Sequence, residues 1–253
     1  MAGNSSEAAP IHVRDLSSAS GPAWLAGGWR LFRGRPFVWV GLTAGWMVIT
    51  LGLVMVPLIG GVVANLLQPV FFASFALAAR RQLSGETIDM GDLFSGFRRP
   101  LRALVNVGAL LLAAELLIFA LMGAMGLPGL TPGDKGALFD FEAWVQALSG
   151  KEWILVAGAL LTGVVKGALW FAPALLAFHD LNTMHAVRWS IYAALSNLGA
   201  MIAYGVALTV MFVAAALPWG LGLLVAIPVM VVSTYAGYAA VFGDGPPPGR
   251  PQP

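Results

Sequence analysis

The chain has 253 residues, of which 58% are hydrophobic and only 10% carry a charge, and its mean hydropathy is +0.81. A soluble domain carries about 25% charged residues, so this composition excludes an ordinary soluble domain and predicts one integral membrane domain. The absence of cysteine excludes disulfides and thiolate sites, and the net charge of +2 gives no indication of a nucleic-acid partner.

Residues 1–20 are polar and hold no apolar run, which predicts a disordered segment rather than a cleaved secretory signal. The membrane domain is expected over residues 21–242. It opens with LAGGWRLFRGRPF, in which arginines alternate with large apolar residues. This pattern is typical of a short helix on the cytoplasmic membrane surface, with aromatic rings at headgroup level and arginines on anionic phosphates. Its residues are Trp29, Arg30, Arg33 and Arg35, with Leu31 and Phe32 sinking into the headgroup boundary. The alternative is plain anchoring without specific lipid binding.

Two spans are expected next, over residues 37–56 and 59–79. Residues 37–79 hold no charge, and this run of 43 is about twice the roughly 20 residues that cross a bilayer. VPLIGG in its middle has the proline and glycines of a tight turn. In the second span, Asn65 and Gln68 lie one turn apart. They either face a common cavity or bond across helices.

The segment LFSGFRRPLR repeats the basic and aromatic pattern, with Gly96 aligned to Gly28, and predicts a second interfacial helix, carrying Phe97, Arg98 and Arg99. A third span follows over residues 103–126, with Glu115 as its one charge. The loop after it contains an amphipathic pattern at 137–148, which predicts a helix resting on the outer interface.

A fourth span is expected over residues 153–177, and its one charge is Lys166. Glu115 lies 12 residues before Leu127, and Lys166 lies 13 residues after Trp153, or roughly 18 and 20 Å along antiparallel helices. A lone charge at this depth is costly, so the shared depth predicts that the two residues pair.

The pair is interpreted either as a structural ion pair that fixes helix register or as a site for proton- or ion-coupled transport; a third possibility is that the two never meet. Gly163 and Gly167 around Lys166 form a G-x-x-x-G arrangement that admits a close helix. Thr162 and Trp170 are the expected supporting residues, as a hydrogen-bond partner and as a cation–π partner of the ammonium. Pro173 predicts a kink beside the pair.

The third repeat, HAVRWSIYAALSNLG, is a looser match and contributes Arg188 and Trp189. Spans over 198–216 and 220–241 follow, separated by LPWGLG, and the Pro/Gly-rich residues 243–253 predict a disordered tail. A Pro-x4-Ser pattern recurs in the second helix of the first and last pairs, as Pro69 to Ser74 and Pro228 to Ser233.

The loops place eleven arginines on one side of the predicted membrane and two lysines on the other. By the positive-inside rule, both termini therefore face the cytoplasm. The predicted fold is an all-α integral membrane protein with six transmembrane helices. They form three hairpins of the same orientation, each preceded by a short cytoplasmic interfacial helix.

The stretches GWRLFRGRPFVWVGL, DLFSGFRRP, WFAPALLAFHDL and LPWGLGLL, in this order, resemble an uncharacterised family of proteobacterial six-span hypothetical transmembrane proteins. The chain is more distantly similar to the membrane domain attached to some glycerophosphodiester phosphodiesterases, although no catalytic domain is present. The resemblance implies a bacterial inner-membrane protein and brings no catalytic residues.

No nucleophile–base pair, zinc signature, phosphate loop or dinucleotide fingerprint is present. We therefore expect a non-catalytic multi-pass protein of the bacterial inner membrane, without a cofactor or a metal. Its expected role is to organise lipid or a membrane protein partner through the basic aromatic helices, and its expected partners are anionic headgroups rather than nucleic acid. The alternative is a small transporter or permease with a mid-membrane site at Glu115 and Lys166.

Overall fold

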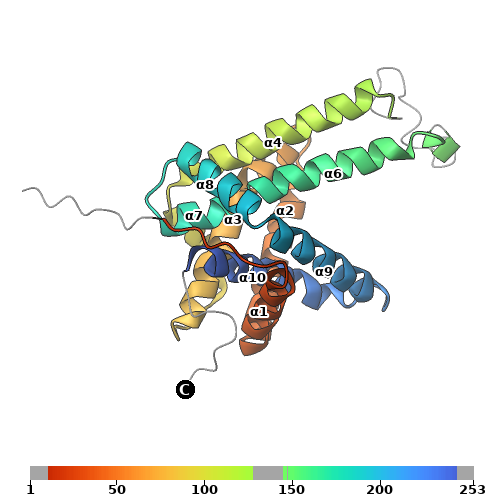
Figure 1. The fold of residues 1–253 in the computed structure, drawn as a ribbon. Helices are drawn as coiled ribbons and strands as arrows, with labels where there is room; N and C mark the ends of the chain where they lie inside the picture. The colour runs from red at the N-terminus through yellow and green to blue at the C-terminus, as the bar shows by residue number, and fades with distance from the viewer. Residues whose placement is uncertain (1–10, 128–144, 147, 244–253) are drawn as a thin grey trace, which may run out of the picture.

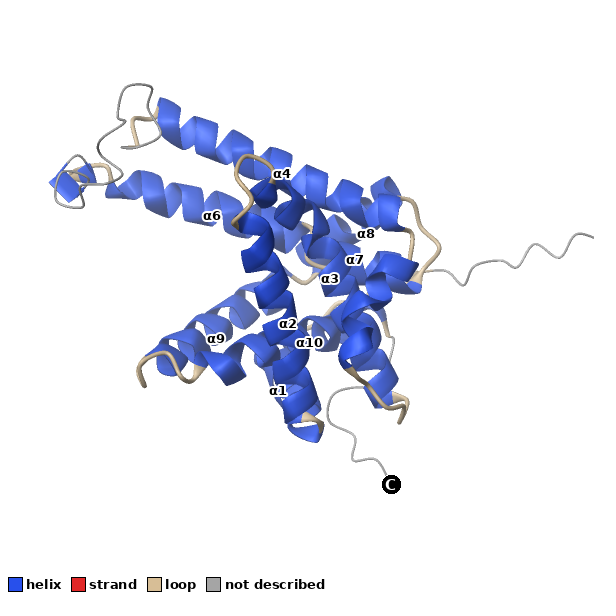
Figure 2. Ribbon diagram, turned by 180° about the vertical axis from the view of Figure 1, so that it is seen from behind, coloured by secondary structure: helices blue, strands red, loops and turns tan. Residues whose placement is uncertain are grey.

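A computed structural model gives the fold and describes residues 11–127, 145–146 and 148–243. The described residues form helices and no strand, which confirms the all-α class (Figures 1 and 2). The helices are α1 (Ser20–Gly34), α2 (Pro36–Val54), α3 (Gly60–Leu83), the 3₁₀ helix η1 (Met90–Arg98), α4 (Leu101–Ala124), α6 (Glu152–Ala168), α7 (Ala172–Phe178), α8 (Thr183–Ser196), α9 (Leu198–Ala216) and α10 (Leu223–Phe242).

Within the described residues, six helical stretches are long and apolar enough to cross a membrane, which confirms the predicted number of spans. They are α2, α3, α4, the stretch Glu152–Phe178, α9 and α10. α3 continues four residues past the predicted end at residue 79, because the helical hydrogen bonding runs on through Arg80, whose carbonyl accepts from Ser84 at 3.0 Å. The fourth span is broken into α6 and α7 at residues 169–171.

A short helix precedes each pair of long helices: α1 before α2, η1 before α4 and α8 before α9. Their placement on a membrane surface, and the common orientation of the hairpins, stay predictions. The expectation that Leu31 and Phe32 reach the headgroups is wrong, since both are buried in the protein core. α1 packs its apolar face on α9 and α10, so this face is covered by protein while Trp29 stays exposed.

Part of the predicted disordered N-terminus packs on the helices. The Arg14 N–H donates to the Val241 carbonyl at 2.9 Å, and the Leu16 N–H donates to Asn197 Oδ1 at 2.9 Å. Asn197 is buried between α8 and α9, and its amide also donates to the Arg14 carbonyl at 3.0 Å. These bonds order residues 11–19, whereas residues 1–10, most of 137–148 and 244–253 lie outside the described residues.

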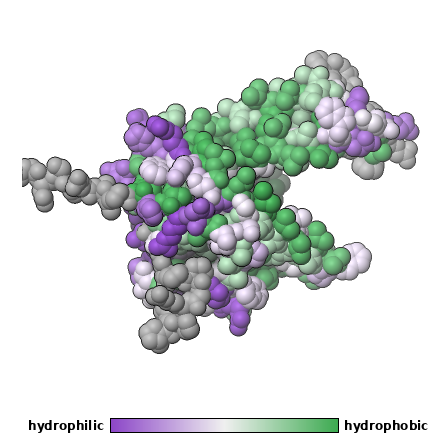
Figure 3. All heavy atoms as spheres, viewed as in Figure 1, coloured by the Kyte–Doolittle hydropathy of each residue, from purple (hydrophilic) through white to green (hydrophobic). Residues whose placement is uncertain are grey.

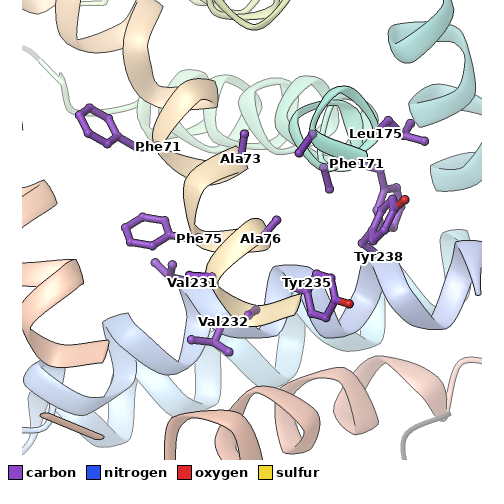
Figure 4. Close-up of a cluster of buried hydrophobic side chains, with 14 of the residues drawn as sticks. Phe71, Ala73, Phe75, Ala76, Phe171, Leu175, Val231, Val232, Tyr235 and Tyr238 are labelled. Carbon is purple, nitrogen blue, oxygen red and sulfur yellow. The ribbon is translucent and has the colours of Figure 1, made fainter. Parts of the chain in front are cut away.

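The centre of the molecule is formed by α3, α7 and α10, the last helices of the three pairs. Half of the apolar window of α3 and 61% of that of α10 are buried inside the protein, against 11% for α9 and 17% for α2. Figure 4 shows the side chains that these helices bring together: Phe71 and Phe75 from α3, Leu175 from α7, and Val231 and Tyr235 from α10. We call α3, α7 and α10 the inner helices.

We call a short helix, together with the two long helices that follow it, a unit. Each short helix packs on the inner helix of the unit before it in the chain. The first short helix packs on the inner helix of the last unit, so these contacts form a closed ring. η1 packs on α3, where the Gly96 N–H donates to Ser74 Oγ at 2.8 Å. α8 packs on α7, and α1 packs on α10. A Cβ at Gly28 would lie 2.6 Å from the Cβ of Ser233. Gly96 and Gly28, which align in the sequence, therefore meet Ser74 and Ser233 of the Pro-x4-Ser pattern.

The long helices extend from this centre as two diverging arms. The pair α4–α6 forms one arm and the pair α9–α10 the other, as both ribbon views show (Figures 1 and 2). Figure 3 shows that the arms are covered by hydrophobic residues, whereas hydrophilic residues gather at the end where α7 and α8 lie. A hollow lies between the two arms (Figure 3).

Candidate functional site

The structure brings Glu115 of α4 and Lys166 of α6 together, with 2.9 Å between Lys166 Nζ and Glu115 Oε1. α4 and α6 pack against each other, so a charge in each finds its partner across one interface. The two side chains differ in exposure: Glu115 is 17% exposed and Lys166 is 44% exposed. The bond is therefore direct, and the ammonium is the half of the pair that reaches the surface.

Trp170 does not cover the Lys166 ammonium. Its ring packs edge-on against Tyr204 of α9, with centroids 5.6 Å apart, and within the described residues the one recorded cation–π contact joins Arg80 to Phe178. The reason is that α6 ends at Ala168, so Trp170 does not follow Lys166 by one turn of a continuous helix. No hydrogen bond from Thr162 to the pair is recorded among the described side chains.

Ser190 of α8 bridges the break between α6 and α7. Its fully buried hydroxyl donates to the Ala168 carbonyl at 2.7 Å and accepts from the Phe171 N–H at 3.1 Å. A broken helix inside a membrane is tolerated where such a partner satisfies the freed backbone groups. No pattern in the sequence singles out Ser190, whereas Pro173, which sits at the start of α7, marks the break.

Asn65 and Gln68 do not join the pair. The Asn65 amide donates to the Gly61 carbonyl of its own helix at 3.0 Å, and neither residue is among the described residues that line the hollow between α6 and α9. At this level α4 packs directly on α3, since a Cβ added at Gly108 of α4 would lie 2.8 Å from the Cα of Leu66. The Asn65 amide therefore bonds within its own helix, which is neither of the two arrangements expected from the sequence.

A second group of polar residues surrounds a cavity of about 670 Å³ between the end of α3 and η1. We call its four arginines, Arg80, Arg81, Arg98 and Arg99, the arginine cluster. Arg81 is neutralised, since it pairs with Glu86 at 3.0 Å and also with Asp92.

The other members of the arginine cluster are placed differently. The guanidinium carbon of Arg80 lies 4.9 Å from the Phe178 ring centroid. Arg98 and Arg99 are exposed, and no ion pair or hydrogen bond to their side chains is recorded among the described residues.

The packing of η1 holds Arg98 and Arg99 at this cavity. Phe97 turns inward and lies edge-on against Phe71 of α3, with centroids 5.5 Å apart. Asp89 caps the start of η1 by accepting from the Gly91 N–H at 2.7 Å. Gly96 lies so close to Val70 and Ser74 that a side chain would collide with α3. The residues that follow Phe97 therefore project from a fixed helix end.

The other predicted interfacial residues form smaller basic and aromatic surfaces. On α8, a cavity of about 500 Å³ is lined by His185, Arg188, Trp189 and Tyr192, and the rings of the last two lie 6.0 Å apart. On α1, Trp29 stacks on Phe32 with centroids 5.7 Å apart. Arg30 and Arg33 are exposed there and Arg35 is partly buried.

The hollow between the arms is a groove of about 800 Å³ lined by α6, the end of α8 and α9. Apart from Lys166, its described lining carries no Asp, Glu, Lys or Arg. Apart from Thr209 and Tyr204, the rest of the described lining is formed by apolar side chains and glycines, which gives a mostly apolar groove with one cation in its side. We call it the α6–α9 groove.

Comparison with known proteins gives one informative similarity. The chain is 29% identical to a protein of Burkholderia thailandensis named "probable inner membrane protein", over 92% of this chain and 94% of that protein. No family model matches the chain, and no solved structure matches it. The similarity fits the resemblance to an uncharacterised membrane family, whereas the more distant one to glycerophosphodiester phosphodiesterases stays a prediction. The chain is thus similar, along nearly its whole length, to a bacterial membrane protein.

Proposed function

We propose that this chain is a non-catalytic, multi-pass protein of a bacterial inner membrane that binds anionic phospholipid headgroups through its arginine-bearing short helices. The observation that carries the proposal is the arginine cluster. Its cavity of about 670 Å³ is edged by four arginines, and Arg98 and Arg99 extend into it from a helix end that the core holds in place. Arginine presents a planar fork of donors that suits phosphate oxygens.

Charge at the cavity supports an anionic ligand. The lining contains Glu86, Asp89 and Asp92, and all three have partners inside the protein. Glu86 and Asp92 bind Arg81, and Asp89 holds the start of η1. Arg98 and Arg99 remain to balance the charge of a phosphate, and the apolar side chains of Leu77 and Phe178 form another part of the wall.

The proposed location rests on two supports. The relative from Burkholderia thailandensis carries an inner-membrane name, and the described chain has six helices suited to spanning. The eleven arginines in the loops of one side favour a cytoplasmic position for both termini and for the arginine cluster. In that orientation the cluster lies beside the anionic leaflet.

The test is the stabilisation of the purified protein, in neutral detergent, by phosphatidylglycerol and by phosphatidylcholine. A ligand that binds the folded state raises the unfolding midpoint, and one arginine near a lipid surface contributes about 1 kcal/mol. We expect phosphatidylglycerol to stabilise the wild type more, and R98Q/R99Q to reduce that difference. The control is Arg102→Gln, which changes an exposed arginine outside the cavity lining. Equal stabilisation by both lipids, or an equal loss in the control, would overturn the proposal.

A second candidate function is a small transporter that uses Glu115 and Lys166. It is favoured by the helix break next to the pair, since transporter sites often lie at discontinuous helices, and by the 44% exposure of Lys166. The direct bond and the apolar groove beside it favour the first proposal. Proton uptake by proteoliposomes that is present in the wild type and absent in Glu115→Gln would reverse this preference.

A further inference from the structure

Three junctions join successive units of the chain, and long helices pack directly against each other at two of them. At the first, α4 lies directly against α3, with Gly108 at the backbone of Leu66. At the second, α2 packs on α10. At the third, the corresponding helices α6 and α9 are separated by the α6–α9 groove, with its volume of about 800 Å³. The groove thus lies where, at the other two junctions, the corresponding helices pack directly against each other.

Glycines in the groove walls face open space. A Cβ added at Gly163 of α6 or Gly205 of α9 would meet no described atom within 4 Å. At the packed junction, the same addition at Gly108 would collide with α3. The two glycines therefore leave room along the groove that the described chain does not use.

One cation lies in the groove wall, and a second lies one helical turn from the groove lining on α8. Lys166 stands in the wall with its side chain 44% exposed. On α8, Ile191 and Leu195 line the groove. Arg188, at three and seven residues before them, lies on the same stripe of the helix. Arg188 also lines the neighbouring cavity of about 500 Å³ with His185, Trp189 and Tyr192. No Asp or Glu is among the described residues that line either space.

We propose that the α6–α9 groove binds one anionic phospholipid, with its phosphate at Arg188 and an acyl chain between α6 and α9. Apolar walls match the chain, and the cations match the negative headgroup. Lys166 Nζ binds Glu115 on one side, and the exposed side of the ammonium faces the bound lipid. The inference deepens the proposed function, on which it rests for the class of ligand, but it uses residues outside the arginine cluster.

The experiment uses phosphatidylglycerol with a diazirine on one acyl chain, added in equimolar amount to the full-length protein in neutral detergent. After irradiation, the labelled peptides are mapped by mass spectrometry. We expect label on α6 and α9. Gly205→Leu, which fills the groove, should lower this label at least about fivefold. The matched control is Gly52→Leu on α2, where a Cβ also meets nothing within 4 Å but which lies outside the groove lining; it should keep the label.

Other outcomes also decide the inference. Circular dichroism and gel filtration establish that both leucine variants fold, and leucine is a better helix former than glycine. Arg188→Gln should lower labelling by phosphatidylglycerol and leave labelling by a phosphatidylcholine probe unchanged. Label spread evenly over α2 and α4, equal loss in Gly52→Leu, or a groove that proves to be a dimer contact broken by Gly205→Leu would overturn it. R98Q/R99Q should keep the groove label, so failure at the groove and failure at the arginine cluster are told apart.

Discussion

At the scale of single residues, the unequal exposure of the two charged partners decides how each one responds to substitution. Glu115 is 17% exposed and Lys166 is 44% exposed, although they share one bond of 2.9 Å. A carboxylate that loses its partner stays in an apolar environment. A lysine that loses its partner can extend its chain toward the groove, because long cationic side chains snorkel to polar surroundings.

Lys166→Met should therefore destabilise the protein more than Glu115→Gln does. An unpaired charge at a helix centre in the bilayer costs about 2.5–3.5 kcal/mol on insertion scales, which sets the order of the loss expected for the lysine variant. The double variant should recover most of the loss, because a buried pair is worth little relative to an apolar replacement. The wild type, the two single variants and the double variant are compared by their unfolding midpoints in mixed micelles. Two single variants as stable as the wild type would show that the pair has no structural role.

Ser190 gives a second prediction at this scale. Ser190→Ala removes the hydroxyl that serves both the Ala168 carbonyl and the Phe171 N–H. Leaving buried polar groups without a partner costs about 1–3 kcal/mol, so the unfolding midpoint should fall. The control is Ser196→Ala on the same helix, a partly buried serine outside these bonds. Equal stability of the two variants would contradict the bridging role of Ser190.

At the scale of elements, the number of membrane spans follows from the sequence, whereas the contacts between the helices do not. Runs without charge, such as residues 37–79, are long enough to fix the spans. The length of an uncharged run does not predict the break after Ala168, because the break depends on Ser190 from a helix that comes later in the chain. The burial of Leu31 and Phe32 is not predicted either, since a basic aromatic helix has the same pattern whether its apolar face meets lipid or protein.

The short helices should be sensitive to side chains at their contact glycines. Gly28→Leu would place its Cβ 2.6 Å from the Cβ of Ser233 and 2.8 Å from the Ser233 backbone. Overpacking of this kind costs about 1–3 kcal/mol, so α1 should separate from α10 and the midpoint should fall. Gly52→Leu on α2 adds the same side chain in open space and should leave the midpoint unchanged. A Gly28→Leu protein as stable as that control would contradict the packing of α1.

At the scale of the whole molecule, three similar units form a ring around α3, α7 and α10, and the ring is unevenly filled. The alignment of Gly28 with Gly96 and the Pro-x4-Ser pattern indicate that units repeat, but only the structure shows that each glycine packs on a serine of another unit. Likewise, shared depth predicted that Glu115 meets Lys166, whereas nothing local in the sequence predicts that α6 and α9 diverge. Junctions between units depend on contacts far apart in the chain, which periodicity does not contain.

Native mass spectrometry can measure whether the purified protein selects anionic phospholipid. The purified wild type is incubated with equal amounts of phosphatidylglycerol and phosphatidylcholine and released from neutral detergent. A contribution of about 1 kcal/mol from one arginine corresponds to a preference of about fivefold, so phosphatidylglycerol adducts should exceed phosphatidylcholine adducts by at least this factor and decline as salt is added. Adducts of the two lipids in equal amounts, at every salt concentration, would contradict the account.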